Sequence, residues 1–150
     1  MPAVDKPKLY LAGPLFSQAE REFNIWLKKI LSEYFTVYLP QEDGGLMVEM
    51  IGQGSSPVEA SKQVFLGDLK AMQSCDLLLA ILDGRVIDEG VCFEIGYCYA
   101  FKKPCYGLQT DPRRLFPSGN NPMIENALMK ILFDKNEIVK WAKNYHHQTN

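Results

Sequence analysis

The chain has 150 residues, about the length of one typical domain. Apolar residues make up 47% and charged residues 23% of it, which argues against the collagen-like, disordered and coiled-coil classes. The formal net charge is −2, so the chain lacks the positive footprint that a nucleic acid or an anionic membrane surface would need. We therefore expect one globular domain over residues 1–150, with a small molecule as its partner.

The cysteines indicate a reducing environment. All four lie between residues 75 and 105, and none belongs to a C-x-x-C pair. The N-terminus has no signal-peptide pattern, and no apolar run approaches 18 residues. We expect reduced thiols in a cytoplasmic protein, with no disulfide, no metal site and no cofactor.

The first third of the chain predicts a strand, a helix and a second strand. Residues 9–12 form a short apolar run that ends at Gly13-Pro14, and the pattern from Ser17 to Glu20 is typical of a capping box before a helix. Residues 35–39 have the composition of a strand. The glycines and serines of residues 44–57 predict a long loop, of the kind that often acts as a lid.

The rest of the chain continues the alternation of helices and strands. We expect helices at residues 58–73, at 90–102 and from 123 onward, and strands at 76–82, 105–108 and 137–140, followed by a short tail. The run at 76–82 is almost unbroken in its apolar character, as in a strand covered on both faces. This order predicts an open parallel five-stranded sheet with helices on both faces.

Ligands of such sheets bind beyond the carboxyl ends of the strands. We therefore expect a ligand near the loops that follow the predicted strands, at residues 13–17, 40–57, 83–90 and 109–122. Neither a dinucleotide-type G-x-G-x-x-G nor a G-x-x-x-x-G-K-[ST] phosphate loop follows the first strand. This absence weighs against a nicotinamide enzyme and against an ATPase.

Glu94 is the carboxylate whose setting is most informative. It lies about one turn into a predicted helix whose N-terminus faces the ligand side, where the helix dipole favours an ionised carboxylate. From spacing alone, an ordinary surface glutamate is the more common alternative. Asp68 could likewise be an exposed residue of its helix. Tyr10, in the first predicted strand, could be an aromatic residue of the core.

Five segments, taken together and in order, resemble the nucleoside 2-deoxyribosyltransferase family over about residues 8–130. They are YLAGPLFS at 10–17, DL at 68–69, CD with its apolar run at 75–82, DEGVCFEIGY at 88–97 and NPM at 121–123. The resemblance implies a flavodoxin-like fold and the exchange of the nucleobase of a 2′-deoxyribonucleoside. The reaction would pass through a covalent sugar–enzyme intermediate with net retention, and the partners would be a deoxyribonucleoside and a free nucleobase.

The resemblance also implies a role for each matching residue. Glu94 corresponds to the nucleophile, Tyr10 to the hydroxyl that orients it, and Asp68 to the group that handles the proton of the base. Asp88 corresponds to a ligand of the sugar 5′-hydroxyl, and the resemblance implies further substrate-binding residues at Gly13, Phe16, Gln41 and Gly90.

Asn121 and Met123 correspond to positions supplied by a neighbouring subunit, which implies a dimer or larger assembly with a composite active site. Two alternatives remain: an N-glycosidase acting on deoxynucleoside 5′-monophosphates, and a non-catalytic nucleoside or nucleotide sensor. A carboxylate at Asp88 would repel a phosphate dianion, which favours a nucleoside substrate. The choice between purine and pyrimidine bases stays open.

Overall fold

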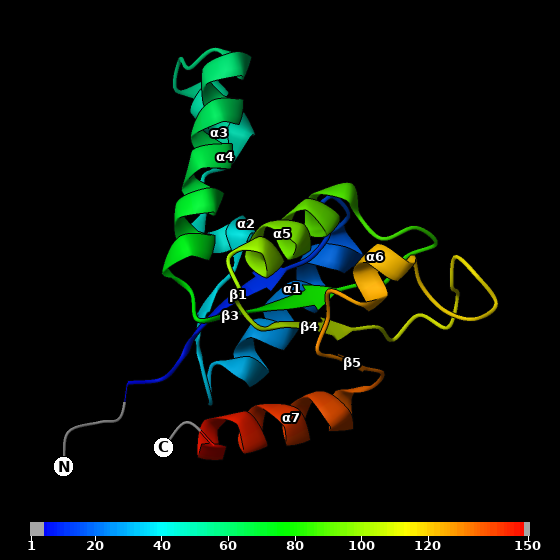
Figure 1. Cartoon of the computed structure of the whole chain (residues 1–150). Coiled ribbons are helices and arrows are strands. Elements are labelled where there is room, and N and C mark those ends of the chain that lie inside the picture. Colours follow the sequence, from blue (N-terminus) through cyan, green and yellow to red (C-terminus); the bar gives the residue numbers. More distant parts are fainter. Residues whose placement is uncertain (1–4, 149–150) are drawn as a thin grey trace.

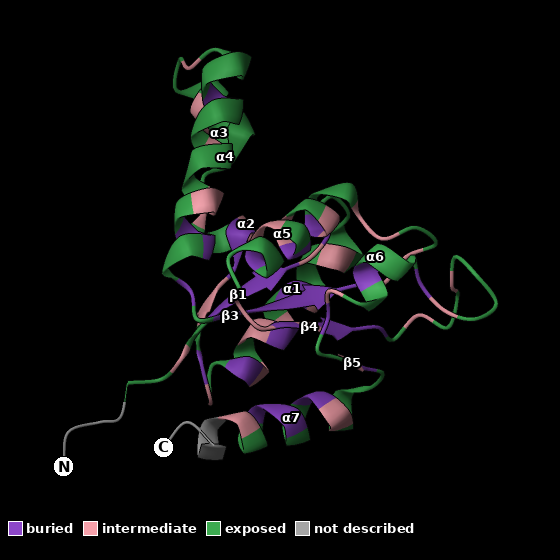
Figure 2. Ribbon diagram, in the orientation of Figure 1, coloured by how far each residue is buried: buried purple, intermediate pink, exposed green. Residues whose placement is uncertain are grey.

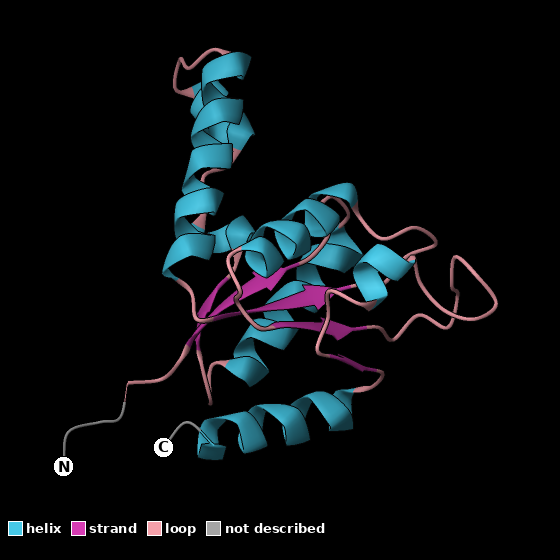
Figure 3. Cartoon of the chain, in the orientation of Figure 1, coloured by secondary structure: helices cyan, strands magenta, loops and turns pink. Residues whose placement is uncertain are grey.

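A computed structural model of the chain describes residues 5–148, the last three by their backbone only. All strand pairs are parallel, and the strands form one sheet in the order β2-β1-β3-β4-β5 (Figures 1 and 3). The strands are β1 (Lys8–Ala12), β2 (Thr36–Tyr38), β3 (Leu77–Ile81), β4 (Cys105–Leu108) and β5 (Lys130–Leu132). This is the flavodoxin-like order, so the predicted fold class is confirmed, and the order reverses between β1 and β3.

Helices cover both faces of the sheet, as Figure 2 shows by the burial of the strands between them. One face carries α1 (Gln18–Leu31) and α7 (Lys135–Gln148); the other carries α4 (Pro57–Ser74), α5 (Glu89–Ala100) and α6 (Pro122–Glu125). Successive residues of a strand point to opposite faces. Leu9 and Leu11 therefore pack with α1 and α7, whereas Tyr10 and Ala12 pack with α4 and α5.

Side-chain caps fix where three of these helices begin. Ser17 and Glu20 form the predicted capping box at the start of α1, and Ser56 and Glu59 form a second one at the start of α4. The carboxylate of Asp88 accepts a hydrogen bond from the backbone of α5. The N-terminus of α5 thereby lies beside the carboxyl end of β3.

The prediction of a long loop over residues 44–57 is wrong. The segment contains α3 (Met47–Gly52), which follows the short α2 (Pro40–Asp43) and packs along α4. Together α3 and the first half of α4 project from the sheet as an arm (Figure 1). The apolar residues of α3 favour the helix, and Gly54, with a φ of 103°, makes the turn that follows it.

The predictions for the last quarter of the chain are also wrong. The helix expected from residue 123 ends at Glu125, β5 follows at 130–132, and the strand expected at 137–140 lies within α7. The carboxylate of Asp134 accepts hydrogen bonds from the backbone N–H groups of Asn136 and Glu137, which starts α7. The expected short tail is therefore mostly helix.

The four cysteines are free thiols, and three of them are buried. Burial raises the pKa of Cys75 and Cys105 to about 11 and that of Cys98 to about 12, so these thiols stay protonated. Among the side chains of residues 5–145, no three His, Cys, Asp or Glu groups are placed to hold a metal ion. In the same range, no helix is both long and apolar enough to cross a membrane.

Candidate active site

Two tyrosines lie side by side on neighbouring strands. Tyr10 of β1 and Tyr38 of β2 are paired in the parallel register, and both contact the core beneath α4 and α5. Their rings stack with centroids 5.4 Å apart and an angle of 20° between the planes. The rings hold both phenol groups on the face of the sheet where α4 and α5 pack.

Each tyrosine donates a hydrogen bond to a carboxyl group from a different helix. The Tyr10 hydroxyl donates to Oε1 of Glu94 on α5 at 2.6 Å, and the Tyr38 hydroxyl donates to Oδ1 of Asp68 on α4 at 3.3 Å. The structure thus brings together three predicted site residues and adds Tyr38. Sequence reasoning missed Tyr38 because a strand pattern does not give the register between two strands.

Burial controls the protonation of both carboxyl groups. It raises the pKa of Glu94 to about 7, with a further increase from the charges of Asp68 and Asp88 and an opposing effect from the Tyr10 hydrogen bond. It also raises the pKa of Asp68, against the effect of Tyr38. The expected stabilisation of ionised Glu94 by the helix dipole is therefore outweighed. Both phenols have raised pKa values, so they remain neutral donors.

Asp88 lies at the N-terminus of α5, on the same helix as Glu94. Its Oδ2 accepts a hydrogen bond from the backbone N–H of Val91 at 3.1 Å, and its charge acts on Glu94. A Cβ atom at Gly90 would lie 3.0 Å from this carboxylate oxygen. Gly90 therefore keeps space open around the Asp88 carboxylate.

The side chain of Gln41, predicted to bind substrate, is bonded to α1. Its Oε1 accepts a hydrogen bond from buried Asn24 at 2.8 Å, and its Nε2 donates to the backbone carbonyl of Arg21 at 3.1 Å. Asn24 also donates to the carbonyl of Pro14 at 2.9 Å. These bonds tie α2 and the loop after β1 to α1, a structural role that the sequence did not reveal.

The loop after β1 contains the other two predicted contact residues. A Cβ atom at Gly13 would lie 2.9 Å from Cδ1 of Ile81 and 3.2 Å from Oδ1 of Asn24, so close packing explains the glycine. Phe16 has a side chain that is 73% exposed, while its backbone N–H donates to Glu20. The ring of Phe16 is therefore exposed and free to contact a ligand, whereas its backbone N–H is already bonded.

Asn121 and Met123 lie apart from the two tyrosine–carboxyl pairs. They line a cavity of about 450 Å³ on the α6 side of α5, and none of Tyr10, Asp68 and Glu94 lines it. Asn121 caps α6, because its Oδ1 accepts a hydrogen bond from the backbone N–H of Met123. Met123 itself is 80% exposed. The structure does not bring these two residues to Glu94 within one chain.

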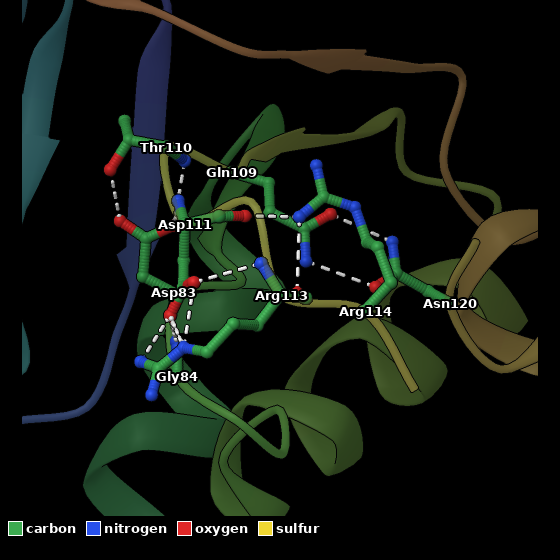
Figure 4. A network of polar contacts seen from close by, with 8 residues as sticks. All are labelled: Asp83, Gly84, Gln109, Thr110, Asp111, Arg113, Arg114 and Asn120. Carbon is green, nitrogen blue, oxygen red and sulfur yellow. Dashed lines mark hydrogen bonds and ion pairs between the residues drawn. The ribbon is translucent and has the colours of Figure 1, made fainter. Parts of the chain in front are cut away.

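A polar network holds the loop before α6 in place (Figure 4). The Asp83 carboxylate accepts hydrogen bonds from the N–H and hydroxyl of Thr110, both at 2.6 Å, and from the N–H of Asp111 at 2.8 Å. The buried amides of Gln109 and Asn120 exchange two hydrogen bonds of 3.0 and 2.8 Å. The loop is therefore fixed to the end of β3, from which the segment leading to Asp88 departs.

Solved structures resemble this chain along most of its length. A conserved protein from Enterococcus faecalis is 28% identical, covers 93% of this chain and 99% of its own, and superposes with a TM-score of 0.75. A 2-deoxyribosyltransferase from Bacillus psychrosaccharolyticus is 27% identical, with coverage of 88% and 90% and a TM-score of 0.73. A CMP N-glycosidase from Clostridium botulinum, 19% identical with coverage of 92% and 98% and a TM-score of 0.58, shares the fold.

Comparison with curated protein sequences gives no match. A family model does match, and its description is nucleoside 2-deoxyribosyltransferase. The match covers residues 9–140 and includes both tyrosine–carboxyl pairs. The chain therefore belongs to the nucleoside 2-deoxyribosyltransferase family and is an enzyme that acts on the N-glycosidic bonds of nucleosides.

Proposed function

We propose that this enzyme transfers 2-deoxyribose from one nucleobase to another, with Glu94 as the nucleophile. The observation that carries the proposal is the 2.6 Å hydrogen bond from neutral Tyr10 to Oε1 of Glu94. This bond orients the carboxyl group, and among the described residues Oε2 has no hydrogen-bond donor. An oriented carboxylate with one free oxygen suits attack on an anomeric carbon.

In the first step the C1′–N bond to the departing base breaks as Oε2 of Glu94 bonds to C1′. The transition state gains positive charge on the sugar and negative charge on the base. Glu94 offsets the first charge, and Asp68 offsets the second by giving its proton to the leaving nitrogen. The products are a glycosyl ester on Glu94, ionised Asp68 and a neutral base.

In the second step an incoming base attacks C1′ through a ring nitrogen, and the C1′–O bond to Glu94 breaks. The nitrogen loses its proton to Asp68, which returns to its starting state. Two inversions at C1′ give net retention. The reactive form of the enzyme therefore has an ionised Glu94 and a protonated Asp68.

The raised pKa of Asp68 supports its role as the acid, because burial favours the protonated carboxyl group. Both groups are partly buried on the same face of the sheet, and the charge of Asp68 raises the pKa of Glu94. The proton in the reactive form is on Asp68, next to the base.

We assign the 5′ end of the sugar to Asp88, whose carboxylate accepts a hydrogen bond from an uncharged hydroxyl but repels a phosphate. Asn121 and Met123 complete the site of a neighbouring subunit in a dimer or larger assembly. Their cavity on the far side of α5 and the exposure of Met123 support this assignment. The substrates are thus a deoxyribonucleoside and a free nucleobase.

The test is to incubate the enzyme with a deoxynucleoside and a second free base, and to separate the products by chromatography. Formation of the second deoxynucleoside supports the proposal. Release of free deoxyribose alone would indicate an N-glycosidase, and absence of turnover would indicate a sensor. A parallel incubation with the 5′-monophosphate should turn over more slowly, because of Asp88.

A further inference from the structure

The hydroxyl of Tyr38 is the only hydrogen-bond donor to Asp68 among the described residues, and it bonds to Oδ1 at 3.3 Å. The Tyr38 ring cannot turn freely, because it stacks on Tyr10. The backbone at Gly44 also closes on the pair, since a Cβ atom there would lie 3.2 Å from the Tyr38 hydroxyl and 3.3 Å from Oδ1 of Asp68. The contact between phenol and carboxyl is thus enclosed by the end of β2, by α4 and by the segment after α2.

We propose that Tyr38 is a positioning residue that holds Oδ1 of Asp68 and leaves Oδ2 to exchange the proton with the nucleobase. The inference deepens the proposed function and rests on it. Tyr38 acts on the reaction through Asp68, in the same way that Tyr10 acts through Glu94.

Tyr38 also sets the pH range in which Asp68 can act as an acid. A phenol that donates to a carboxyl group stabilises its ionised form, and this effect opposes the increase in the pKa of Asp68 caused by burial. The titratable groups near this pair come from four elements and their ends: Tyr10, Glu94, Asp43 and Cys75. All four groups ionise to anions, so none of them lowers the pKa of Asp68, and the hydrogen bond from Tyr38 supplies the opposing effect.

Replacing Tyr38 by Phe removes the hydroxyl and keeps the ring that stacks on Tyr10. We expect the Asp68 carboxyl to lose its fixed orientation and its pKa to rise, because the ionised form loses the hydrogen bond that stabilises it. Base departure should slow by about 10-fold, the order expected when an acid loses its orientation. The alkaline limb of kcat/KM should move to higher pH.

The kinetic experiment compares Tyr38→Phe with Tyr99→Phe, which removes an exposed phenol from α5. Each variant is assayed over a range of pH with a natural deoxynucleoside and with N7-methyl-2′-deoxyguanosine, whose base leaves without taking up a proton. We expect Tyr38→Phe to slow only the natural substrate, and Tyr99→Phe to slow neither. Equal slowing of both substrates by Tyr38→Phe would overturn the proposal.

A second measurement does not depend on turnover. The protein is labelled with ¹³C at the aspartate carboxyl groups, the Asp68 signal is assigned with Asp68→Asn, and its titration is followed by NMR in wild type and in Tyr38→Phe. An upward change in the pKa of Asp68 supports the role of Tyr38, and an unchanged pKa overturns it. Absence of turnover by the wild type would instead overturn the proposed function, so the two failures are distinguishable.

Discussion

Glu94→Gln tests the assignment of the nucleophile through stability as well as through activity. The substitution keeps the size of the side chain and an oxygen that can accept the Tyr10 hydrogen bond, but it removes the ionisable group. We expect transfer activity to fall by several orders of magnitude, because the amide cannot attack C1′. We also expect the stability of the variant, relative to the wild type, to increase toward alkaline pH.

The expected gain follows from the pKa of Glu94. Burial raises it from 4.5 to about 7, so folding favours the protonated form. The stabilisation that this provides is complete below pH 4.5 and is lost as the pH rises through 7. The difference between the two pKa values corresponds to about 3 kcal/mol at pH 8. Glutamine does not ionise, so the variant keeps its stability over this range.

The assay is urea unfolding of wild type and Glu94→Gln at pH 4 and pH 8. The free energy of unfolding of the variant, relative to wild type, should rise by about 3 kcal/mol between these two values. The comparison between pH values cancels the pH-independent cost of the amide. Glu89→Gln, at an exposed position on the same helix, should show no such rise. If the stability of Glu94→Gln relative to the wild type is the same at both pH values, the pKa of Glu94 is not raised by folding, and the reasoning is refuted.

Four further predictions concern catalysis, assembly and packing. The kcat/KM of the wild type should decrease as the pH falls below about 7, because protonated Glu94 cannot attack; a flat pH profile would contradict this. Asp68→Asn should slow natural nucleosides by about 10²- to 10⁴-fold but leave N7-methyl-2′-deoxyguanosine nearly unaffected, as measured by initial rates. A mixture of Glu94→Ala and Asn121→Ala subunits should regain about a quarter of wild-type activity in an exchanging dimer, since one of two sites is intact in each mixed pair; no recovery after verified exchange would exclude a composite site. Gly13→Ala should lower the free energy of unfolding by about 1–3 kcal/mol, because its Cβ would collide with Ile81, and thermal denaturation checks this.

The elements of the fold could be predicted where an apolar run is long or where a capping motif marks the start of a helix. The apolar run of β3 and the capping box at Ser17 gave correct elements, because burial and capping act locally. The pattern failed near the C-terminus, where Ile138, Trp141 and Ala142 are buried at the spacing of a helix. The prediction of a strand at 137–140 is wrong there, because a short apolar segment fits a strand or a helix equally well. It also failed in the arm, where apolar residues of α3 pack on α4 despite nearby glycines.

The candidate site was predictable in its residue types and not in its pairings. Motif order identified Tyr10, Asp68 and Glu94, which the structure brings together. The contact of Tyr38 with Asp68 depends on the parallel register of β1 and β2 and on the packing of α4, which are long-range properties. A sequence pattern contains no direct signal for either.

The paired arrangement of the site explains why its hydrogen-bond donors are tyrosines. A cation beside Glu94 or Asp68 would lower the pKa of both carboxyl groups, and the proton needed by the leaving base would be lost near neutral pH. The phenols of Tyr10 and Tyr38 orient the two carboxyl groups and remain neutral, since both have raised pKa values. Because the rings stack on adjacent strands, the sheet fixes Glu94 and Asp68, the proposed nucleophile and acid, relative to each other. The ionised form of Glu94 is less stable in return, and in the proposed mechanism this instability would disappear when the carboxylate bonds to C1′, which would make the partly buried anion reactive.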